Sequence, residues 1–102
     1  MTKIIVLGGA GDMGSRAVED LAAAPGIERV TVADRNLAAA SRLAAKLQGG
    51  VASVDAKSVD ATDRRALVEA LRGYDVAAST LGPFYRFEAA LIRAAIEAGV
   101  DY

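Results

Sequence analysis

The sequence predicts an α/β fold, a doubly wound parallel sheet with helices on both faces. Short aliphatic runs, typical of strands buried on both faces, alternate along the chain with amphipathic stretches of helical period. The first run, at 4–7, leads directly into the glycine-rich segment 8–14, after which a helical pattern begins. The second run, at 30–33, ends at Asp34, twenty residues beyond the last glycine of that segment. Strands that alternate with helices in this way form one parallel sheet through right-handed crossovers.

Length and composition narrow the possible functions. The 102 residues suffice for one domain, and 53% hydrophobic with 5% aromatic residues predicts an aliphatic core. A formal net charge of −1 gives no basic footprint, so we expect neither a nucleic acid nor a membrane as partner. Without cysteine or histidine the chain lacks thiolates and imidazoles, and we expect no metal site. No membrane span or signal-peptide layout is present in the sequence, which favours a cytoplasmic protein.

The glycine-rich segment contains the motif Gly9-x-Gly11-x-x-Gly14 between a predicted strand and a predicted helix. In a dinucleotide fingerprint, Gly9 makes the tight turn, Gly11 lets the backbone approach a pyrophosphate, and Gly14 lets the helix pack close to the strand. The N–H groups of Asp12 and Met13 would then face the anion at the positive end of the helix. A packing turn without a ligand is the alternative, because such turns also occur wherever a strand meets a helix.

Asp34 favours the ligand over the packing turn. The first helix is expected after Gly14, through about Ala24, and Pro25-Gly26 ends it before the second strand. An acid at the end of that strand is placed to accept hydrogen bonds from the hydroxyls of an adenosine ribose. The inward face of the helix is expected to carry Met13, Ala17, Leu21 and Ala24.

The middle of the chain predicts two helices around an edge strand. Asn36 is placed to cap the second helix, and a short half-exposed strand is expected within 51–59. Thr62 is expected to cap the third helix, which ends at Gly73. Asp60-Ala61 would lie beside an adenine, although turn formation alone also explains these residues. The expected inward residues are Ala40, Leu43, Ala44 and Leu47 in the second helix and Leu67, Val68 and Leu71 in the third.

The last third of the chain predicts a fourth strand at 76–79, a loop at 80–87 and a helix at 88–98. The expected fold is therefore Rossmann-like, with the strand order 3-2-1-4. Residues 100–102 are expected to be only the first residues of a fifth strand. The ligand crevice of this fold would lie beyond the carboxyl ends of strands one and four, where the order reverses. The last helix is expected to bury Leu91, Ile92, Ala95 and Ile96.

Beyond this fold, the sequence resembles the saccharopine dehydrogenase-like family over essentially all its length. The distinctive parts are 75–87, which contains Gly82-Pro83-Phe84-Tyr85, and 94–102, which ends in Gly-Val-Asp-Tyr. The resemblance implies an NAD(P)-dependent oxidoreductase that transfers hydride between nicotinamide and the carbon–nitrogen centre of an amino acid or related amine. It also implies cofactor contacts: Gly9, Ala10, Gly11, Asp12, Met13 and Gly14 at the pyrophosphate, Asp34 and Arg35 at the adenosine ribose, Asp60 and Ala61 at the adenine, and Thr80, Leu81 and Gly82 near the nicotinamide.

Two neighbouring residues, Asp34 and Arg35, favour different cofactors. Asp34 favours NAD, because a carboxylate repels a 2′-phosphate. Arg35 points to NADP, since a guanidinium pairs with phosphate, although it could also stack on adenine or lie in solvent. We expect NAD, with NADP left open. No catalytic residue is identified: Tyr85 and Arg86 either touch substrate or pack against another domain.

Family members continue into a large substrate and dimerisation domain. We therefore expect 1–102 to be a dinucleotide-binding domain whose small amino-acid substrate is bound by the absent domain. Alone, it should bind dinucleotide weakly and turn over nothing. A homodimer through the open side of the fourth strand would be a product of truncation.

Three other interpretations remain. An atypical short-chain dehydrogenase fits the spacing Gly8-x-x-Gly11-x-x-Gly14, but the chain has no Tyr-x-x-x-Lys pair. A regulatory nucleotide-sensing module would use the same fingerprint and acid. A purely structural module leaves the glycines and Asp34 unexplained.

Overall fold

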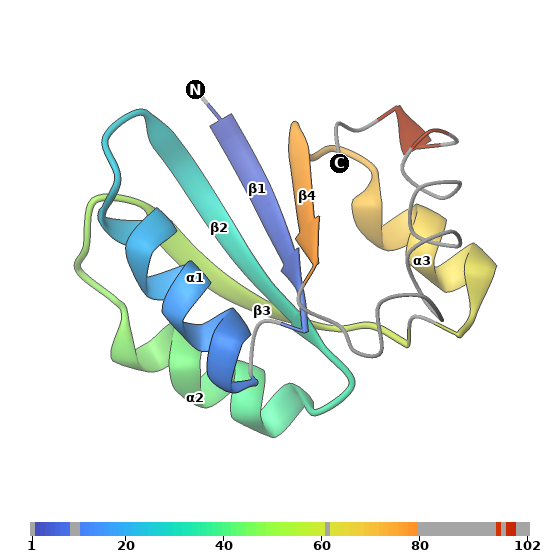
Figure 1. The fold of residues 1–102 in the computed structure, drawn as a ribbon, viewed down its shortest axis with the longest axis horizontal. Coiled ribbons are helices and arrows are strands. Elements are labelled where there is room, and N and C mark those ends of the chain that lie inside the picture. The colour runs from blue at the N-terminus through green and yellow to red at the C-terminus, as the bar shows by residue number, and fades with distance from the viewer. Residues whose placement is uncertain (1, 9–10, 61, 80–95, 97, 100–102) are drawn as a thin grey trace.

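The computed structural model describes residues 2–8, 11–60, 62–79, 96 and 98–99. Within these residues, four parallel strands pair in the order β3-β2-β1-β4, which confirms the predicted topology (Figure 1). Strands and helices alternate along the chain: β1 (Thr2–Leu7), α1 (Asp12–Ala23), β2 (Ile27–Asp34), α2 (Leu37–Lys46), β3 (Ser53–Ser58), α3 (Arg64–Leu71) and β4 (Val76–Ser79).

Helices cover both faces of the sheet, with α1 and α2 on one face and α3 on the other (Figure 1). Successive residues of β1 point to opposite faces because the side-chain period of a strand is two. Ile4 and Val6 pack in the core cluster under α1 and α2, whereas Ile5 and Leu7 pack in the cluster under α3. This burial on both faces explains why β1 reads as an unbroken aliphatic run.

The strand register brings the carboxyl ends of the strands to one edge of the sheet. Leu7, the last residue of β1, lies opposite Ala33 of β2 and Ser79 of β4. Asp34, the last residue of β2, lies opposite Ser58 of β3. The strand order reverses between β1 and β4, so the ligand crevice of this fold class lies at that edge.

The α1 helix differs from the prediction in its start and in its inward face. It begins at Asp12, with Gly11 as N-cap, and so includes Gly14, after which the sequence predicts its start. Among the side chains of this helix that the structure describes, Val18 and Ala22 are the buried hydrophobic ones, whereas Ala17, Leu21 and Ala24 are only half-buried. The predicted inward side chain of Met13 lies outside the described ones. A face of small and β-branched residues lies closest to the sheet, and the larger Leu21 fills its margin.

Of the two predicted helix caps, one is confirmed and one is wrong. Asn36 Oδ1 accepts a hydrogen bond from the backbone N–H of Ala39 at 3.0 Å. The cap of α3 is Asp63, not Thr62, and Asp63 Oδ1 accepts from the N–H of Ala66 at 3.1 Å. Thr62 instead donates both its hydroxyl and its N–H to Asp60 Oδ1, at 2.6 and 2.9 Å.

The remaining predictions for the scaffold are mostly confirmed. The strand β3 lies at the edge of the sheet, and the inward face of α3 carries Ala70 as well as the three expected residues. Ile96 is the exception, because its side chain is 75% exposed while Ala98 packs against the cluster under α3. Residues two apart on a helix point about 200° apart, so both cannot face the core. The predicted loop at 80–87, the rest of the last helix and the fifth strand lie outside the described residues.

One fully buried polar side chain, that of Thr31 in β2, lies on the α3 side of the sheet. Its hydroxyl donates to Asp55 Oδ1 at 2.5 Å and lies 2.7 Å from the hydroxyl of Tyr74. A carboxylate can only accept and a threonine hydroxyl has one hydrogen, so Tyr74 is the donor to Thr31. Asp55 also pairs with Arg29, and the ammonium of Lys57 lies 5.1 Å from the centre of the Tyr74 ring. This network ties β2, β3 and the segment before β4 together.

Candidate functional site

Among the described residues, three backbone hydrogen bonds hold the turn between β1 and α1. The N–H of Gly8 donates to the carbonyl of Ala33 at 2.8 Å, the N–H of Gly11 to Gly8 at 3.2 Å, and the N–H of Ser15 to Gly11 at 2.8 Å. Gly8 has φ of 75°, a left-handed conformation that favours glycine. Sequence reasoning assigned the tight turn to Gly9 alone and missed Gly8; the Gly-Gly doublet is the signal that could have found it.

The fold itself does not explain why residue 11 is a glycine. Its φ of −76° is open to any residue. A Cβ there would have its nearest described neighbour, the Gly8 carbonyl oxygen, at an ordinary 3.5 Å. Gly11 is also exposed, so its missing side chain leaves the backbone accessible to solvent. A pyrophosphate can approach the backbone closely only where no Cβ stands in the way, and Gly11 meets this requirement.

The start of α1 supplies hydrogen-bond donors beside Gly11. By helix geometry the first N–H groups of the helix, those of Asp12, Met13 and Gly14, have no acceptor within the helix. The N-cap Gly11 has no side chain that could accept from them. These donors and the helix dipole favour an anion at this position, which is beyond the carboxyl end of β1.

Asp34 ends the neighbouring strand β2 and is half-buried. Its Oδ1 accepts a hydrogen bond from the N–H of Asn36 at 3.0 Å, which orients the carboxylate at the carboxyl edge of the sheet. The N–H of Gly8 bonds to Ala33, the residue just before Asp34. The structure therefore brings the predicted phosphate turn and the predicted ribose carboxylate together across one pair of strands.

Arg35 and Asp60 are exposed residues that follow β2 and β3 at the same edge. The hydroxyl and N–H of Thr62 hold the pKa of Asp60 below its ordinary value of 3.8, and the positive charge of Arg35 contributes in the same direction. The adenine role of Asp60 stays a prediction, as does the ribose role of Arg35. Outside the described residues lie Gly9, Ala10, Ala61, Thr80, Leu81 and Gly82.

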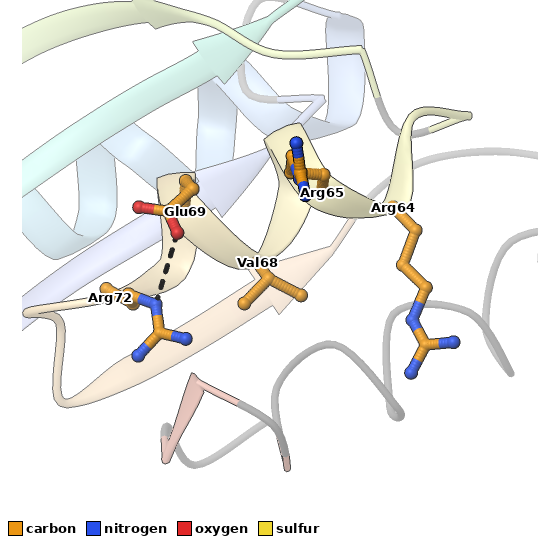
Figure 2. Close-up of a pocket in the computed structure, with 5 residues that line it drawn as sticks. All are labelled: Arg64, Arg65, Val68, Glu69 and Arg72. Atoms are coloured by element: carbon orange, nitrogen blue, oxygen red, sulfur yellow. Dashed lines mark ion pairs between the residues drawn. The ribbon is translucent and has the colours of Figure 1, made fainter.

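A separate pocket of about 350 Å³ lies along α3 and involves none of the predicted cofactor residues. Figure 2 shows Arg64 and Arg72 leaving opposite ends of the helix, and Arg72 pairs with Glu69 at 3.6 Å. The described lining residues are Arg64, Arg65, Val68, Glu69 and Arg72.

Neither a metal-binding cluster nor a membrane-spanning helix occurs in the described part of the chain. No cluster of three or more carboxylates there could hold a metal ion. In the same ranges, no helix has the length and apolar character needed to cross a membrane.

Comparison with known proteins shows which family the sequence matches. The model of the saccharopine dehydrogenase NADP-binding domain matches residues 4–102. Apo saccharopine dehydrogenase (L-Glu forming) from Saccharomyces cerevisiae is 32% identical, with a TM-score of 0.80, over 98% of this chain and 20% of that one. A protein of Burkholderia pseudomallei described as exported is 34% identical, with a TM-score of 0.71, over 98% of this chain and 44% of that one.

The same fold also occurs in more distant proteins. A nucleoside-diphosphate-sugar epimerase from Pseudomonas aeruginosa is 24% identical, with a TM-score of 0.74, over 97% of this chain and 31% of that one. At this identity the likeness concerns the fold alone. The chain spans a fifth of the length of the yeast enzyme and under half of the Burkholderia protein.

Proposed function

The chain belongs to the saccharopine dehydrogenase family, as its NAD(P)-binding domain, and from this we propose that it positions the cofactor for hydride transfer. The substrate would be an amino acid or related amine, oxidised or formed at its carbon–nitrogen centre. When bound, the nicotinamide would supply or accept the hydride. The proposal extends to the chain a substrate class close to that named for the yeast relative.

The observation that carries this proposal is the exposed Gly11 at the start of α1, with the carboxylate of Asp34 on the adjacent strand. The N–H groups of the first turn of α1 would hold the pyrophosphate, and Asp34 would accept hydrogen bonds from the adenosine ribose. These residues fit the cofactor, because the fold leaves the Gly11 backbone exposed and orients the Asp34 carboxylate at the same sheet edge.

The rest of the chemistry belongs, in this proposal, to other parts of a longer protein. Of the three lysines, Lys3 lies at the amino half of β1, Lys46 pairs with Glu19 at 3.8 Å, and Lys57 lies over the Tyr74 ring. None of these positions adjoins the turn after β1. We propose that a further domain binds the amino-acid substrate and completes the active site, and that full-length copies pair through it.

Calorimetric titration of the chain with NADH, NADPH, ADP and ATP tests the cofactor part of the proposal. Dinucleotides should bind, and ADP and ATP should bind more weakly because they lack the second half of the cofactor. A preference for ADP or ATP would instead support a nucleotide sensor. No binding of any dinucleotide at millimolar concentration would contradict the proposal.

Activity assays test the division of labour. The 102-residue chain, incubated with NAD or NADP and a panel of amino acids, should give no increase in absorbance at the wavelength of the reduced cofactor. Measurable amino-acid oxidation by the chain alone would overturn the assignment of catalysis to another domain.

A further inference from the structure

The backbone of Asp34 is held from both sides of β2. Its carbonyl accepts a hydrogen bond from the N–H of Val59, just after β3, at 3.1 Å. On the β1 side, the N–H of Gly8 donates to the carbonyl of the preceding residue, Ala33, at 2.8 Å. With the backbone fixed in this way, the direction of the Asp34 carboxylate depends on its side-chain torsions. Whatever restricts those torsions therefore decides whether the carboxylate can meet a ribose.

Asn36 supplies a hydrogen bond that restricts this carboxylate. The N–H of Asn36 donates to Asp34 Oδ1 at 3.0 Å. A hydrogen bond to an ionised acceptor is stronger than one between neutral groups, so this contact favours one orientation of the side chain. A carboxylate has about four lone-pair sites, so the bond does not by itself prevent Asp34 from also accepting a ribose hydroxyl.

The position of that N–H depends on the start of α2. Asn36 Oδ1 accepts from the N–H of Ala39 at 3.0 Å, and the Asn36 carbonyl accepts from the N–H of Ala40 at 3.1 Å. Ala40 is fully buried in the core cluster under α1 and α2. The cap therefore anchors Asn36 to a helical turn that the core holds in place. Through this anchor, the side chain of Asn36 also fixes its own N–H.

We propose that Asn36 is a positioning residue of the cofactor site, whose side chain caps α2 and so holds the N–H that orients the Asp34 carboxylate towards the adenosine ribose. The proposal rests on the proposed function, because it concerns the carboxylate of the same site. Asn36 acts through Asp34 and not by contact with the cofactor. Both NAD(H) and NADP(H) carry a 3′-hydroxyl on this ribose, so the role applies to either cofactor.

The test measures the dissociation constants of NADH and NADPH by calorimetry for wild type, Asn36→Ala and Asn36→Ser. The alanine variant loses the capping acceptor, which loosens the first turn of α2 and with it the N–H that orients Asp34. It should bind the preferred dinucleotide about threefold to tenfold more weakly, an effect of the size of one hydrogen bond. Serine is also a good N-cap residue, so Asn36→Ser should bind nearly as tightly as wild type.

Asp63→Ala is the matched control for lost stability. Asp63 caps α3 with the same kind of bond, from the N–H of Ala66 to Asp63 Oδ1 at 3.1 Å. Urea denaturation should show a similar loss of stability for Asn36→Ala and Asp63→Ala, whereas only Asn36→Ala should bind dinucleotide more weakly. Equal weakening in the two variants would mean that affinity follows stability, and would overturn the role of Asn36.

A double-mutant cycle tests whether Asn36 acts through Asp34. Asp34→Ala alone should weaken binding at least as much as Asn36→Ala. In the Asp34→Ala background, Asn36→Ala should not change the dissociation constant further, because the carboxylate that it orients is gone. A further loss as large as that in the wild-type background would contradict the proposal, since Asn36 would then act on binding by another route.

The outcomes also separate this proposal from the proposed function. Unchanged dissociation constants in Asn36→Ala, while wild type binds dinucleotide, would overturn the role of Asn36 and leave the cofactor site standing. Absence of binding of either dinucleotide to wild type would overturn both.

Discussion

The N–H of Gly11 donates a hydrogen bond to the carbonyl oxygen of Gly8 at 3.2 Å and closes the turn that leads from β1 into α1. The two glycines serve different ends. Gly8 needs its left-handed φ of 75°, whereas Gly11 has an ordinary backbone conformation, and a Cβ there would make only an ordinary contact with the Gly8 carbonyl oxygen. The described fold does not require glycine at position 11, and we propose that a ligand approaching the backbone explains it.

Gly11→Ala should separate binding from stability. An added methyl group meets the Gly8 oxygen at an ordinary 3.5 Å, so the free energy of unfolding should fall by at most about 1 kcal/mol, the cost of alanine at an N-cap. Affinity for NADH should fall by about tenfold or more, because the methyl group blocks the approach of the pyrophosphate. Urea denaturation and calorimetry measure the two quantities.

Gly50→Ala is the matched control for this substitution. A Cβ at Gly50 would lie 3.6 and 3.7 Å from two carbonyl oxygens, again ordinary contacts, at a site between α2 and β3. Its NADH affinity should equal that of wild type. Equal affinities for wild type and Gly11→Ala would mean that no ligand approaches this backbone.

Tyr74→Phe should destabilise the fold by about 0.5–1.5 kcal/mol, because Thr31 loses one hydrogen bond while keeping its bond to Asp55. Thr31→Val removes the hydroxyl that serves both partners, and should cost more, about 1–3 kcal/mol. Chemical denaturation of both variants measures this order. A valine variant as stable as wild type would show that the network does not stabilise the sheet.

Asp63→Ala should destabilise the protein by about 1 kcal/mol, since the Ala66 N–H loses its capping acceptor. Asp63→Ser keeps an acceptor and should recover most of this loss. Thermal denaturation followed by circular dichroism gives both values. Identical melting temperatures for the alanine and serine variants would argue against Asp63 as the cap of α3.

The lowered pKa of Asp60 predicts a pH-dependent contribution to stability. A carboxyl whose pKa is depressed in the folded state stabilises the fold above its ordinary value, here 3.8, and loses this contribution as the pH falls through the folded value. Asp60→Ala should therefore be less stable than wild type at pH 7, and the difference should shrink below pH 3.8. Urea midpoints measured from pH 7 to pH 2.5 check this; a constant difference would contradict it.

The fold was predictable because its signals are local and redundant. Ile4, Ile5, Val6 and Leu7 are apolar on both faces, and only a strand covered by helices on both sides requires that pattern. The inward faces of the helices were harder to predict. Hydrophobicity alone favoured Leu21 of α1 and Ile96 of the last helix, yet Val18 is buried in α1 and Ile96 is 75% exposed. Periodicity gives the face of a helix, but its phase depends on how closely small residues approach the sheet.

The candidate site was predictable in its parts and not in its connections. Spacing alone pointed to Gly11 and Asp34, and the pairing of β1 with β2 places the turn after β1 beside the end of β2. The Asp60–Thr62 hydrogen bonds and the neighbouring Arg35 depend on the register between β2 and β3, which the sequence does not specify. Thr62 was predicted to cap α3 because threonine is common at helix N-caps. In the structure, its hydroxyl and its N–H both donate hydrogen bonds to the Asp60 carboxylate.

The most direct test of the cofactor site is a titration of the ¹⁵N-labelled chain with NADH, followed by amide chemical shifts. We predict saturable shifts for Gly11, Asp12 and Asp34. Control residues away from the site, such as Ser53 at the start of the edge strand β3, should show no shift. If the amide chemical shifts of the turn and of Asp34 did not change at millimolar NADH, this result would contradict the account.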